Sequence, residues 1–227
     1  MNKLNHIAFI MDGNGRWGIK RKKNRNFGHL NGVKVVKKIV KVSIKFKIPI
    51  ITFYVFSTEN WKRPKIEINY LFNLINLYFE KEIDSVIKNG IKINLIGNIN
   101  KLPIKIKQSL KKTINMTKNN NKIIVNLAIN YGSRSEIINS IKKIKIIKKI
   151  NEKNFSNLLY TKNLPEPDIL IRTGGQKRIS NFLLWQIAYT EIYFLNKLWP
   201  DFNEKDLKKI IIDFKKIKRN FGAINDK

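Results

Sequence analysis

An acid, two glycines and an arginine stand directly after an apolar run near the start of the chain. The run covers residues 7–11, and the string DGNGR at residues 12–16 follows it. Glycines let a backbone turn sharply and present its N–H groups to a ligand, and a helix that begins there adds its positive end. The pattern indicates an anion site, most simply for a phosphate, with Arg16 over it. A tight strand-to-helix turn capped by Asp12 accounts for the string equally well, and the phosphate-loop pattern GxxxxGKS/T is absent.

Two later polar clusters also follow apolar runs. The string STENWKRP at residues 57–64 combines polar groups with Trp61, whose ring could cover an apolar part of a substrate. The string RTGG at residues 172–175 continues to Arg178 and Ser180. Two arginines and a hydroxyl around a glycine turn are typical of a second oxyanion cradle. The first string on its own is also typical of a surface loop. A solvated basic loop explains Lys177 better than Arg172, which directly follows an apolar run.

Acids are scarce in this chain, so the acids beside such turns stand out. The sequence has 16 Asp and Glu residues against 46 Lys and Arg residues. Asp12 and Glu191 could share a hard divalent cation with phosphate oxygens, as is common for Mg²⁺. Glu191 could equally be a buried carboxylate paired with an arginine.

Two anion cradles and the absence of a nucleophile favour a reaction that joins two phosphorylated molecules. The chain has no cysteine and no GxSxG string. Its only imidazoles are those of His6 and His29. Proteases and esterases therefore fit the sequence poorly.

Strands that alternate with helices are expected to position these clusters. Apolar, β-branched runs predict buried strands at residues 7–11, 50–56, 91–96, 123–129 and 169–171. Apolar residues at helical spacing predict helices within residues 31–46, 68–90 and 203–222. Asn203 is the expected N-cap of the last helix, with Gly222 just past its end. Residues 142–163 are the least determined segment, and we expect mobility there.

The alternation predicts an α/β fold. We expect a single domain over residues 1–227, with a mostly parallel, twisted β-sheet flanked by helices. Ligands bind beyond the carboxyl ends of the strands in such a sheet. The polar clusters all follow strand ends, so we expect them to lie close together.

Composition narrows the class of protein further. The formal net charge is +30, and 43% of the residues are hydrophobic, which is enough for a substantial core. A nucleic-acid binder would interleave basic and aromatic residues on one face, whereas the aromatics here sit in apolar runs, so we expect no nucleic-acid partner. The first apolar run is too short for a signal peptide, and no run reaches the ~18 apolar residues of a spanning helix. We expect a cytoplasmic protein that can associate with a membrane surface.

Taken together, the strings resemble one family closely. They are HIAFIMDGNGRWG, FGHLNG, FYVFSTENWKRP, NYGSR, ILIRTGGQKRISNFLLWQIAYTEIYF and LWPDF. In this order they resemble the cis-prenyltransferases, in particular the bacterial undecaprenyl diphosphate synthases, over about residues 6–222. The resemblance implies repeated condensation of isopentenyl diphosphate onto farnesyl diphosphate, which gives a long-chain Z-polyprenyl diphosphate, a precursor of the cell-wall carrier lipid. It also implies Mg²⁺, a homodimer and a hydrophobic tunnel for the growing chain.

The resemblance also implies roles for individual residues. Asp12 would be the catalytic acid that positions Mg²⁺, and Glu191 would support the metal. Asn60 would act in catalysis, near the proton that is lost when the new double bond forms. Arg16, Arg25 and His29 would hold the allylic diphosphate, and Arg172, Arg178 and Ser180 the isopentenyl diphosphate. The full set of implied substrate-binding residues is Gly13, Asn14, Gly15, Arg16, Trp17, Arg25, His29, Ser57, Glu59, Trp61, Arg63, Arg172, Arg178 and Ser180.

Some positions bear on the tunnel or depart from the family pattern. Leu74 and Leu77 could wall the tunnel, although core or dimer packing explains them equally well. Val55 stands where the family usually has Ala, and its extra methyl groups could shorten the product. Asn220 replaces the arginine of an Arg-Phe-Gly motif, and Arg219 lies one residue early. The alternatives are a shorter-chain synthase or a non-catalytic subunit of a two-chain prenyltransferase. Such subunits typically lose the DGNGR signature, which this chain keeps.

Overall fold

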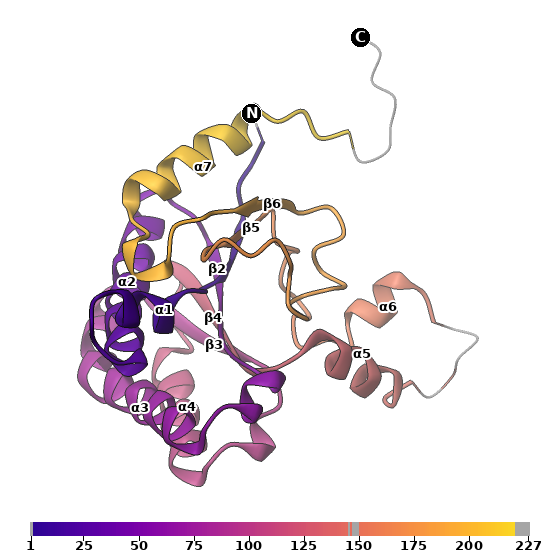
Figure 1. Ribbon diagram of the computed structural model, residues 1–227. Helices are drawn as coiled ribbons and strands as arrows, with labels where there is room; N and C mark the ends of the chain where they lie inside the picture. The colour runs from indigo at the N-terminus through magenta and orange to yellow at the C-terminus, as the bar shows by residue number, and fades with distance from the viewer. Residues whose placement is uncertain (1, 145, 147–149, 221–227) are drawn as a thin grey trace.

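A parallel β-sheet runs through the computed structural model of the protein (Figure 1). The structure describes residues 2–144, 146 and 150–220. Among these residues the sheet has six strands in the order β3-β4-β2-β1-β5-β6, and every neighbouring pair is parallel. The strands are β1 (His6–Ile10), β2 (Ile50–Ser57), β3 (Ile91–Ile96), β4 (Ile123–Tyr131), β5 (Ile169–Arg172) and β6 (Glu191–Phe194). The predicted α/β class is therefore confirmed.

The helices occupy much of the chain between the strands. They are α1 (Asn14–Lys20), α2 (Arg25–Lys45), α3 (Lys65–Lys88), α4 (Ile104–Thr117), α5 (Ser133–Ile141), α6 (Glu152–Ser156) and α7 (Glu204–Lys216). Short 3₁₀ helices are η1 (Thr58–Lys62), η2 (Ile99–Lys101) and η4 (Trp199–Asp201). No helix within the described ranges combines the length and the apolar character needed to cross a membrane.

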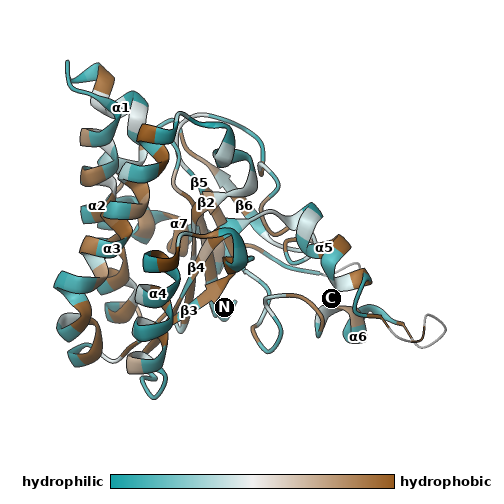
Figure 2. Cartoon of the chain, turned by 90° about the horizontal axis from the view of Figure 1, so that it is seen from below, coloured by the Kyte–Doolittle hydropathy of each residue, from teal (hydrophilic) through white to brown (hydrophobic). Residues whose placement is uncertain are grey.

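The two faces of the sheet are covered differently, because side chains alternate along each strand. Phe9 and Phe53 belong to a large core that α2, α3, α4 and α7 complete. In Figure 2 much of the sheet beside these helices is brown, the colour of hydrophobic residues. Ala8 and Leu170 face a smaller core with Phe182 from the irregular segment before β6. Helices α5 and α6 lie on this second side (Figure 1). Strands β1 to β5 thus have no exposed residue, whereas the edge strand β6 alternates between half-buried and exposed residues.

Several boundaries differ from the sequence predictions. Asn203 caps α7 as predicted, since its side chain accepts from the backbone of Lys205 and Asp206. The helix ends at Lys216, well before the predicted end, and Gly222 lies outside the described residues. Helices α4 and α5 and strand β6 were not predicted. Part of the segment expected to be mobile lies outside the described residues, and the rest contains α6, where Phe155 packs on a tryptophan ring.

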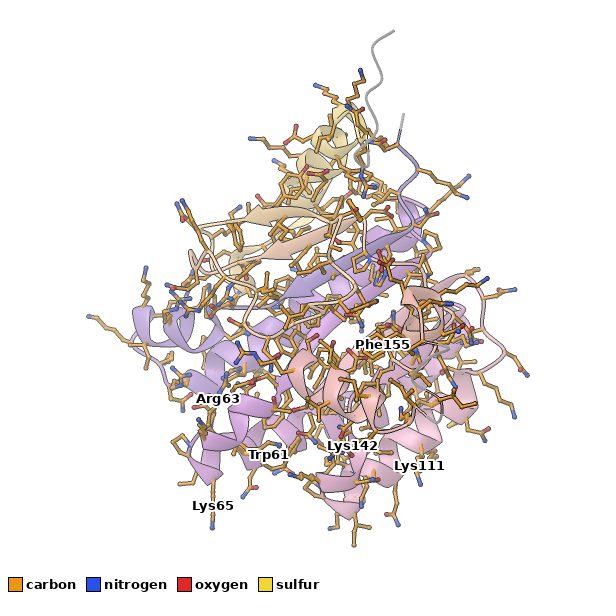
Figure 3. All side chains as sticks on the ribbon, turned by 90° about the vertical axis from the view of Figure 1, so that its right-hand side faces the viewer. Trp61, Arg63, Lys65, Lys111, Lys142 and Phe155 are labelled. Atoms are coloured by element: carbon orange, nitrogen blue, oxygen red, sulfur yellow. The ribbon has the colours of Figure 1, made fainter. Side chains whose placement is uncertain are left out.

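Lysine side chains are exposed on several elements of the fold. Lys65, Lys111 and Lys142 are exposed and project from α3, from α4 and from just past α5 (Figure 3).

Helices α1 and α2 form a tight hairpin that leads from β1 to the large core. Gly28 lies where a Cβ would stand 1.8 Å from the backbone oxygen of Asn14, and a Cβ on Gly18 would stand 2.3 Å from that of Asn24. Only glycine permits such an approach of two backbones. The hairpin therefore fixes the position of the turn that follows β1.

We expect Gly28→Ala to lower the free energy of unfolding by about 2 kcal/mol, because the added methyl group meets rigid backbone. Urea denaturation measures the change. Gly15→Ala is the matched control in the same hairpin, since its Cβ would meet the guanidinium of Arg25, which can swing away. Equal losses in the two variants would contradict the packing argument.

Candidate active site

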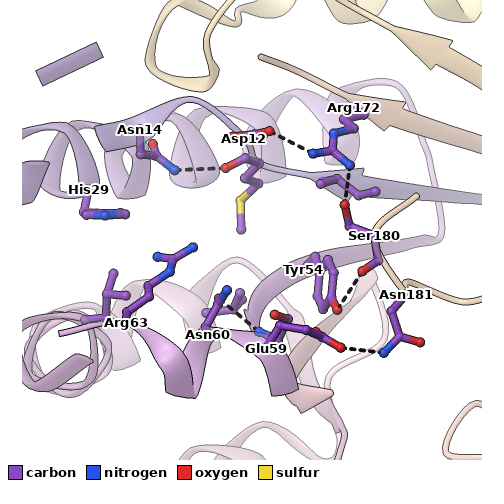
Figure 4. Close-up of a pocket in the computed structure, with 15 residues that line it drawn as sticks. Asp12, Asn14, His29, Tyr54, Glu59, Asn60, Arg63, Arg172, Ser180 and Asn181 are labelled. Carbon is purple, nitrogen blue, oxygen red and sulfur yellow. Dashed lines mark hydrogen bonds and ion pairs between the residues drawn. The ribbon is translucent and has the colours of Figure 1, made fainter. Parts of the chain in front are cut away.

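A cavity of about 510 Å³ opens at the carboxyl ends of β1, β2 and β5 (Figure 4). The polar clusters that follow these strands in the sequence meet there, as predicted from the parallel sheet. The predicted site residues that line the cavity are Asp12, Asn14, His29, Ser57, Glu59, Asn60, Arg63, Arg172 and Ser180. The sheet therefore brings together side chains from both halves of the chain.

An ion pair between Asp12 and Arg172 forms the centre of one wall. The ends of β1 and β5 are neighbours, with Ile10 opposite Arg172. Arg172 Nη2 lies 2.9 Å from Asp12 Oδ2, and its Nη1 donates to Ser180 Oγ at 2.7 Å and to the carbonyl of Arg178. The side chain of Arg172 is only 4% exposed, and its Nε has no hydrogen-bond partner among the described residues. A cation held this rigidly is suited to bind an oxyanion.

Asp12 is also held from the helix that follows it. Its Oδ1 lies 3.1 Å from Arg16 Nη2 at the rim, and its backbone carbonyl accepts from Thr173 Oγ1 at 2.8 Å. Gly13 has φ of 104°, a left-handed conformation that favours glycine, and as a glycine it has no side chain with which to cap α1. The first turn of α1 contains no acid. The start of α1 thus offers N–H groups beside the carboxylate.

Glu67 binds three basic residues at the opposite rim of the cavity. The sequence analysis did not predict this residue. Arg25 bonds both of its carboxylate oxygens at 3.0 and 3.2 Å, and Arg63 and His29 reach Oε1 at 3.1 and 3.3 Å. Burial alone would raise the pKa of Glu67, but these partners hold the pKa below its ordinary value. The spacing of Arg63 and Glu67 by four residues at the start of a helix was the available signal.

The pKa of His29 lies below its ordinary value, although its surroundings act in both directions. Burial is the largest cause and lowers it, and Arg63 and Arg25 lower it further. Glu67 raises it through its charge and hydrogen bond, without reversing the net direction. A neutral imidazole has one N–H group, and when Nε2 donates it to Glu67 Oε1 the other nitrogen, Nδ1, is an acceptor. His29 can therefore donate to an anionic ligand only when it is protonated or leaves Glu67.

The 3₁₀ helix η1 forms a further wall of the cavity. It lies between two basic groups: Arg172 on one side, and the basic residues around Glu67 on the other. Asn60 Oδ1 accepts from the backbone N–H of Ser57 at 3.2 Å, which orients the amide toward the cavity (Figure 4). A carboxamide is neutral at physiological pH, so Asn60 can orient a substrate but cannot take up a proton.

Two predicted tryptophans do not line the cavity. Trp17 stacks on Phe27, lies under the guanidinium of Arg21 at 3.7 Å and donates to Asp201 at 2.7 Å. Trp61 packs on Phe56 and donates its indole N–H to Asn130 at 2.8 Å. Both rings are therefore used to hold neighbouring elements in place.

Other predicted residues lie at the rim or farther away. Gly15 lies in α1 against the guanidinium of Arg25, and the side chain of Arg178 turns to Gln176. Glu191 begins β6 opposite Ile169, at the amino end of the strands. At about 3.3 Å per residue, the strand length separates it from the carboxyl edge where Asp12 lies. Within this chain the structure does not bring Glu191 to Asp12, and its role at a metal stays a prediction.

Asn220 stands where the family motif has an arginine, and the neighbouring Arg219 is already engaged in other contacts. It bonds Asp168 at 3.2 Å and the carbonyl of Tyr189 at 2.6 Å, and lies 3.9 Å from Glu191. These contacts hold it at the amino end of β5 and β6.

An apolar cavity of about 120 Å³ lies beside the polar one, and Met11 and Val55 line both. Val55 is the extra residue of a β-bulge, since Tyr54 pairs with Ala128 and Phe56 with Ile129. The walls come from α2, α3 and strands β3 and β4. They include Leu74 but not Leu77, which is 49% exposed. Of the two leucines considered for a tunnel wall, Leu74 thus lines this apolar cavity, and Leu77 lies on the solvent side of α3.

The sequence of this chain is similar to those of a known protein family. The family described as "Putative undecaprenyl diphosphate synthase" matches residues 10–222. The chain belongs to the undecaprenyl diphosphate synthase family. Its relatives include an isoprenyl transferase of Clostridium tetani, 47% identical over 96% of this chain and 89% of that protein. Another, from Rickettsia bellii, is 46% identical over 98% of this chain and 99% of that protein.

Solved structures of similar proteins agree with this family. Lavandulyl diphosphate synthase from Lavandula x intermedia, in complex with dimethylallyl diphosphate, has a TM-score of 0.92 and 30% identity over 96% of this chain and 98% of that chain. A probable undecaprenyl diphosphate synthase from Campylobacter jejuni has a TM-score of 0.84 and 36% identity over 98% of this chain and 100% of that chain. As a member of the undecaprenyl diphosphate synthase family, the chain is a prenyltransferase of isoprenoid biosynthesis.

In Glu67→Gln we expect the pKa of His29 to fall further, because the charge that raises it is lost while burial, Arg63 and Arg25 still lower it. Imidazole NMR signals followed against pH measure this. The chain has two histidines, so buried His6, whose pKa burial lowers to about 4, is an internal control that should not move. A constant or raised pKa of His29 would count against the coupling.

Proposed function

We propose that this prenyltransferase condenses isopentenyl diphosphate repeatedly onto farnesyl diphosphate and releases a long-chain Z-polyprenyl diphosphate of undecaprenyl length, a cell-wall carrier lipid precursor. The observation that carries the proposal is that Met11 and Val55 line both the polar and the apolar cavity. A polar cavity with two basic groups suits two diphosphates, and an apolar cavity behind it suits the hydrocarbon that grows from one of them.

Each of the two basic groups would bind a different diphosphate substrate. His29, Arg25 and Arg63, held by Glu67, would bind the allylic diphosphate together with the N–H groups at the start of α1. Arg172 and Ser180 would bind isopentenyl diphosphate on the opposite wall. This division places the allylic tail toward Met11 and the apolar cavity. The dimethylallyl diphosphate named for the lavandulyl diphosphate synthase is likewise an allylic diphosphate.

The donor set at Asp12 fits Mg²⁺ in part. Mg²⁺ is commonly held by one or two carboxylates together with substrate phosphates and water. Asp12 supplies one carboxylate, 30% exposed and between two arginines, and the described residues hold no group of three acids or histidines. We therefore propose that Asp12 holds Mg²⁺ only together with diphosphate oxygens. When bound, the metal would neutralise charge on the diphosphate that departs.

The reaction itself asks for charge stabilisation rather than for a nucleophile from the protein. The C–O bond of the allylic diphosphate breaks, and the double bond of isopentenyl diphosphate forms the new C–C bond. Arg16 and the N–H groups of α1 would stabilise the charge that develops on the leaving group. Asn60 would orient the isopentenyl group for loss of its proton, and a diphosphate oxygen would accept it, since an amide is not basic.

Assembly and location belong to the same proposal. We propose a homodimer across the edge strand β6, where Ile192 and Phe194 are exposed apolar residues. We also propose a cytoplasmic enzyme that touches the membrane when it releases its product. Nucleic acid is not among the proposed partners. A shorter product remains the second candidate, because the side chain of Val55 lies between the two cavities.

Incubation with farnesyl diphosphate, radiolabelled isopentenyl diphosphate, Mg²⁺ and mild detergent should give a ladder of labelled polyprenyl products. Asp12→Ala should lower the rate by at least about 100-fold, since it removes the metal carboxylate and leaves buried Arg172 unpaired. Thin-layer separation by chain length measures both. A folded wild-type protein that gives no labelled polyprenyl would contradict the proposed function.

Val55→Ala should shift the end of the ladder to longer products, because it removes two methyl groups between the two cavities. Val42→Ala is the matched control: Val42 is buried in the large core and does not line the apolar cavity. It should cost about 1 kcal/mol or more of stability without changing product length. The same shift in both variants would mean that Val55 does not limit the chain.

A further inference from the structure

The loop that carries Ser180 has an unusual backbone. Ser180, Asn181 and Leu183 have φ of 50°, 61° and 50°, in the left-handed region that residues other than glycine rarely adopt. Each such residue costs of the order of 1 kcal/mol, so contacts outside the loop must hold it in place. Ser180 is the hydroxyl that accepts from Arg172. Whatever holds this loop therefore also positions the Arg172 cradle.

Asn181 makes the contacts that hold the loop. Its Oδ1 accepts from the backbone N–H of Arg134 at 2.9 Å, and its carbonyl accepts from the N–H of Ser133 at 2.8 Å. Its Nδ2 donates to Glu59 Oε1 at 2.8 Å, across the mouth of the cavity (Figure 4). Asn181 is thus bonded both to the start of α5 and to η1.

Close packing constrains the position of the Asn181 amide. A Cβ on Gly132 would lie 2.8 Å from Asn181 Nδ2 and 2.4 Å from Thr58 Oγ1. The missing side chain at Gly132 lets Asn181 and η1 approach each other this closely. The bond to Glu59 is therefore set by packing as well as by charge.

The partner of this bond is an ionised carboxylate. Burial alone would raise the pKa of Glu59, but hydrogen bonds from Asn181 and from residues of η1 hold the pKa below its ordinary value. An amide that donates to a carboxylate makes a charge-assisted hydrogen bond, which is stronger than a neutral one.

We propose that Asn181 is a positioning residue that determines the affinity for isopentenyl diphosphate. Its bond to Glu59 joins the two walls of the cavity: the wall of Ser180 and Arg172, and the wall of η1 that carries Asn60. This fixes the distance between the cradle for one diphosphate and the amide that orients the same substrate. The inference rests on the proposed function for the identity of the substrates.

Asn181→Asp tests the bond with the least disturbance. Asp has the same shape, tolerates the left-handed conformation and keeps the oxygen that accepts from Arg134. It loses only the N–H donor and places a carboxylate against that of Glu59. Glu59→Gln should rescue it, because the new carboxamide at position 59 can donate to the new carboxylate at position 181. Asn163→Asp is the matched control, since Asn163 is an exposed left-handed asparagine (φ 66°) that does not line the cavity.

Isopentenyl diphosphate alone has no allylic partner to react with, so calorimetry measures its Kd directly. We expect N181D to raise this Kd and the KM for isopentenyl diphosphate by at least about fivefold, with the KM for farnesyl diphosphate changed less than about twofold. The double variant N181D/E59Q should recover most of the loss, and N163D should match wild type. If N181D does not fold, Glu59→Ala breaks the same bond from the other side.

Three outcomes would overturn the inference: an unchanged Kd in folded N181D, an equal rise in the KM of both substrates, or no recovery in the double variant. The wild-type chain separates this from the proposed function. A wild type that makes polyprenyl while N181D binds normally overturns the role of Asn181 alone. A wild type that neither binds isopentenyl diphosphate nor makes product overturns both.

Discussion

The ion pair between Asp12 and Arg172 is the contact on which the site depends. A guanidinium as buried as that of Arg172 is costly unless its charge is balanced and its N–H groups are bonded. Asp12, Ser180 and the carbonyl of Arg178 meet most of this requirement. Because the pair joins the ends of two neighbouring parallel strands, the sheet itself fixes its geometry. The Nε–H group is buried and has no partner within the described part of the chain.

The division of the site into polar and apolar parts follows from the alternation of side chains along β2. Tyr54 faces the polar cavity and packs on Phe182, whereas the bulge at Val55 turns that residue toward the helices. A second irregularity in the pairing leaves Asn130 on β4 with a left-handed backbone, and its amide holds the indole of Trp61. The first departure from regular pairing thus places Val55 between the polar cavity and the apolar one, and the second holds Trp61 against β4.

The sequence predicts the parts of the fold that depend on local patterns. Strands β1 to β5 were found within two residues at each end because their apolar runs are buried on both faces. Strand β6 was missed because its residues alternate between half-buried and exposed, and α4 because lysine and isoleucine occur throughout the chain. Strand ends correctly located Asp12, Asn60 and Arg172. They could not give side-chain direction, so Trp17 and Trp61 were expected in the cavity, and Glu191 was paired with Asp12 without knowledge of the strand register.

The position of the apolar cavity along parallel strands has a consequence for how product length would be set. The cavity begins at Val55 and Ile129, at the carboxyl end, and reaches Ile91, which pairs with Ile123 at the start of β4. From Ile123 to Ile129 the strand rises roughly 20 Å at about 3.3 Å per residue. On the proposed function the hydrocarbon advances against the direction of the strands. Product length would then depend on how far the apolar cavity extends along β3 and β4.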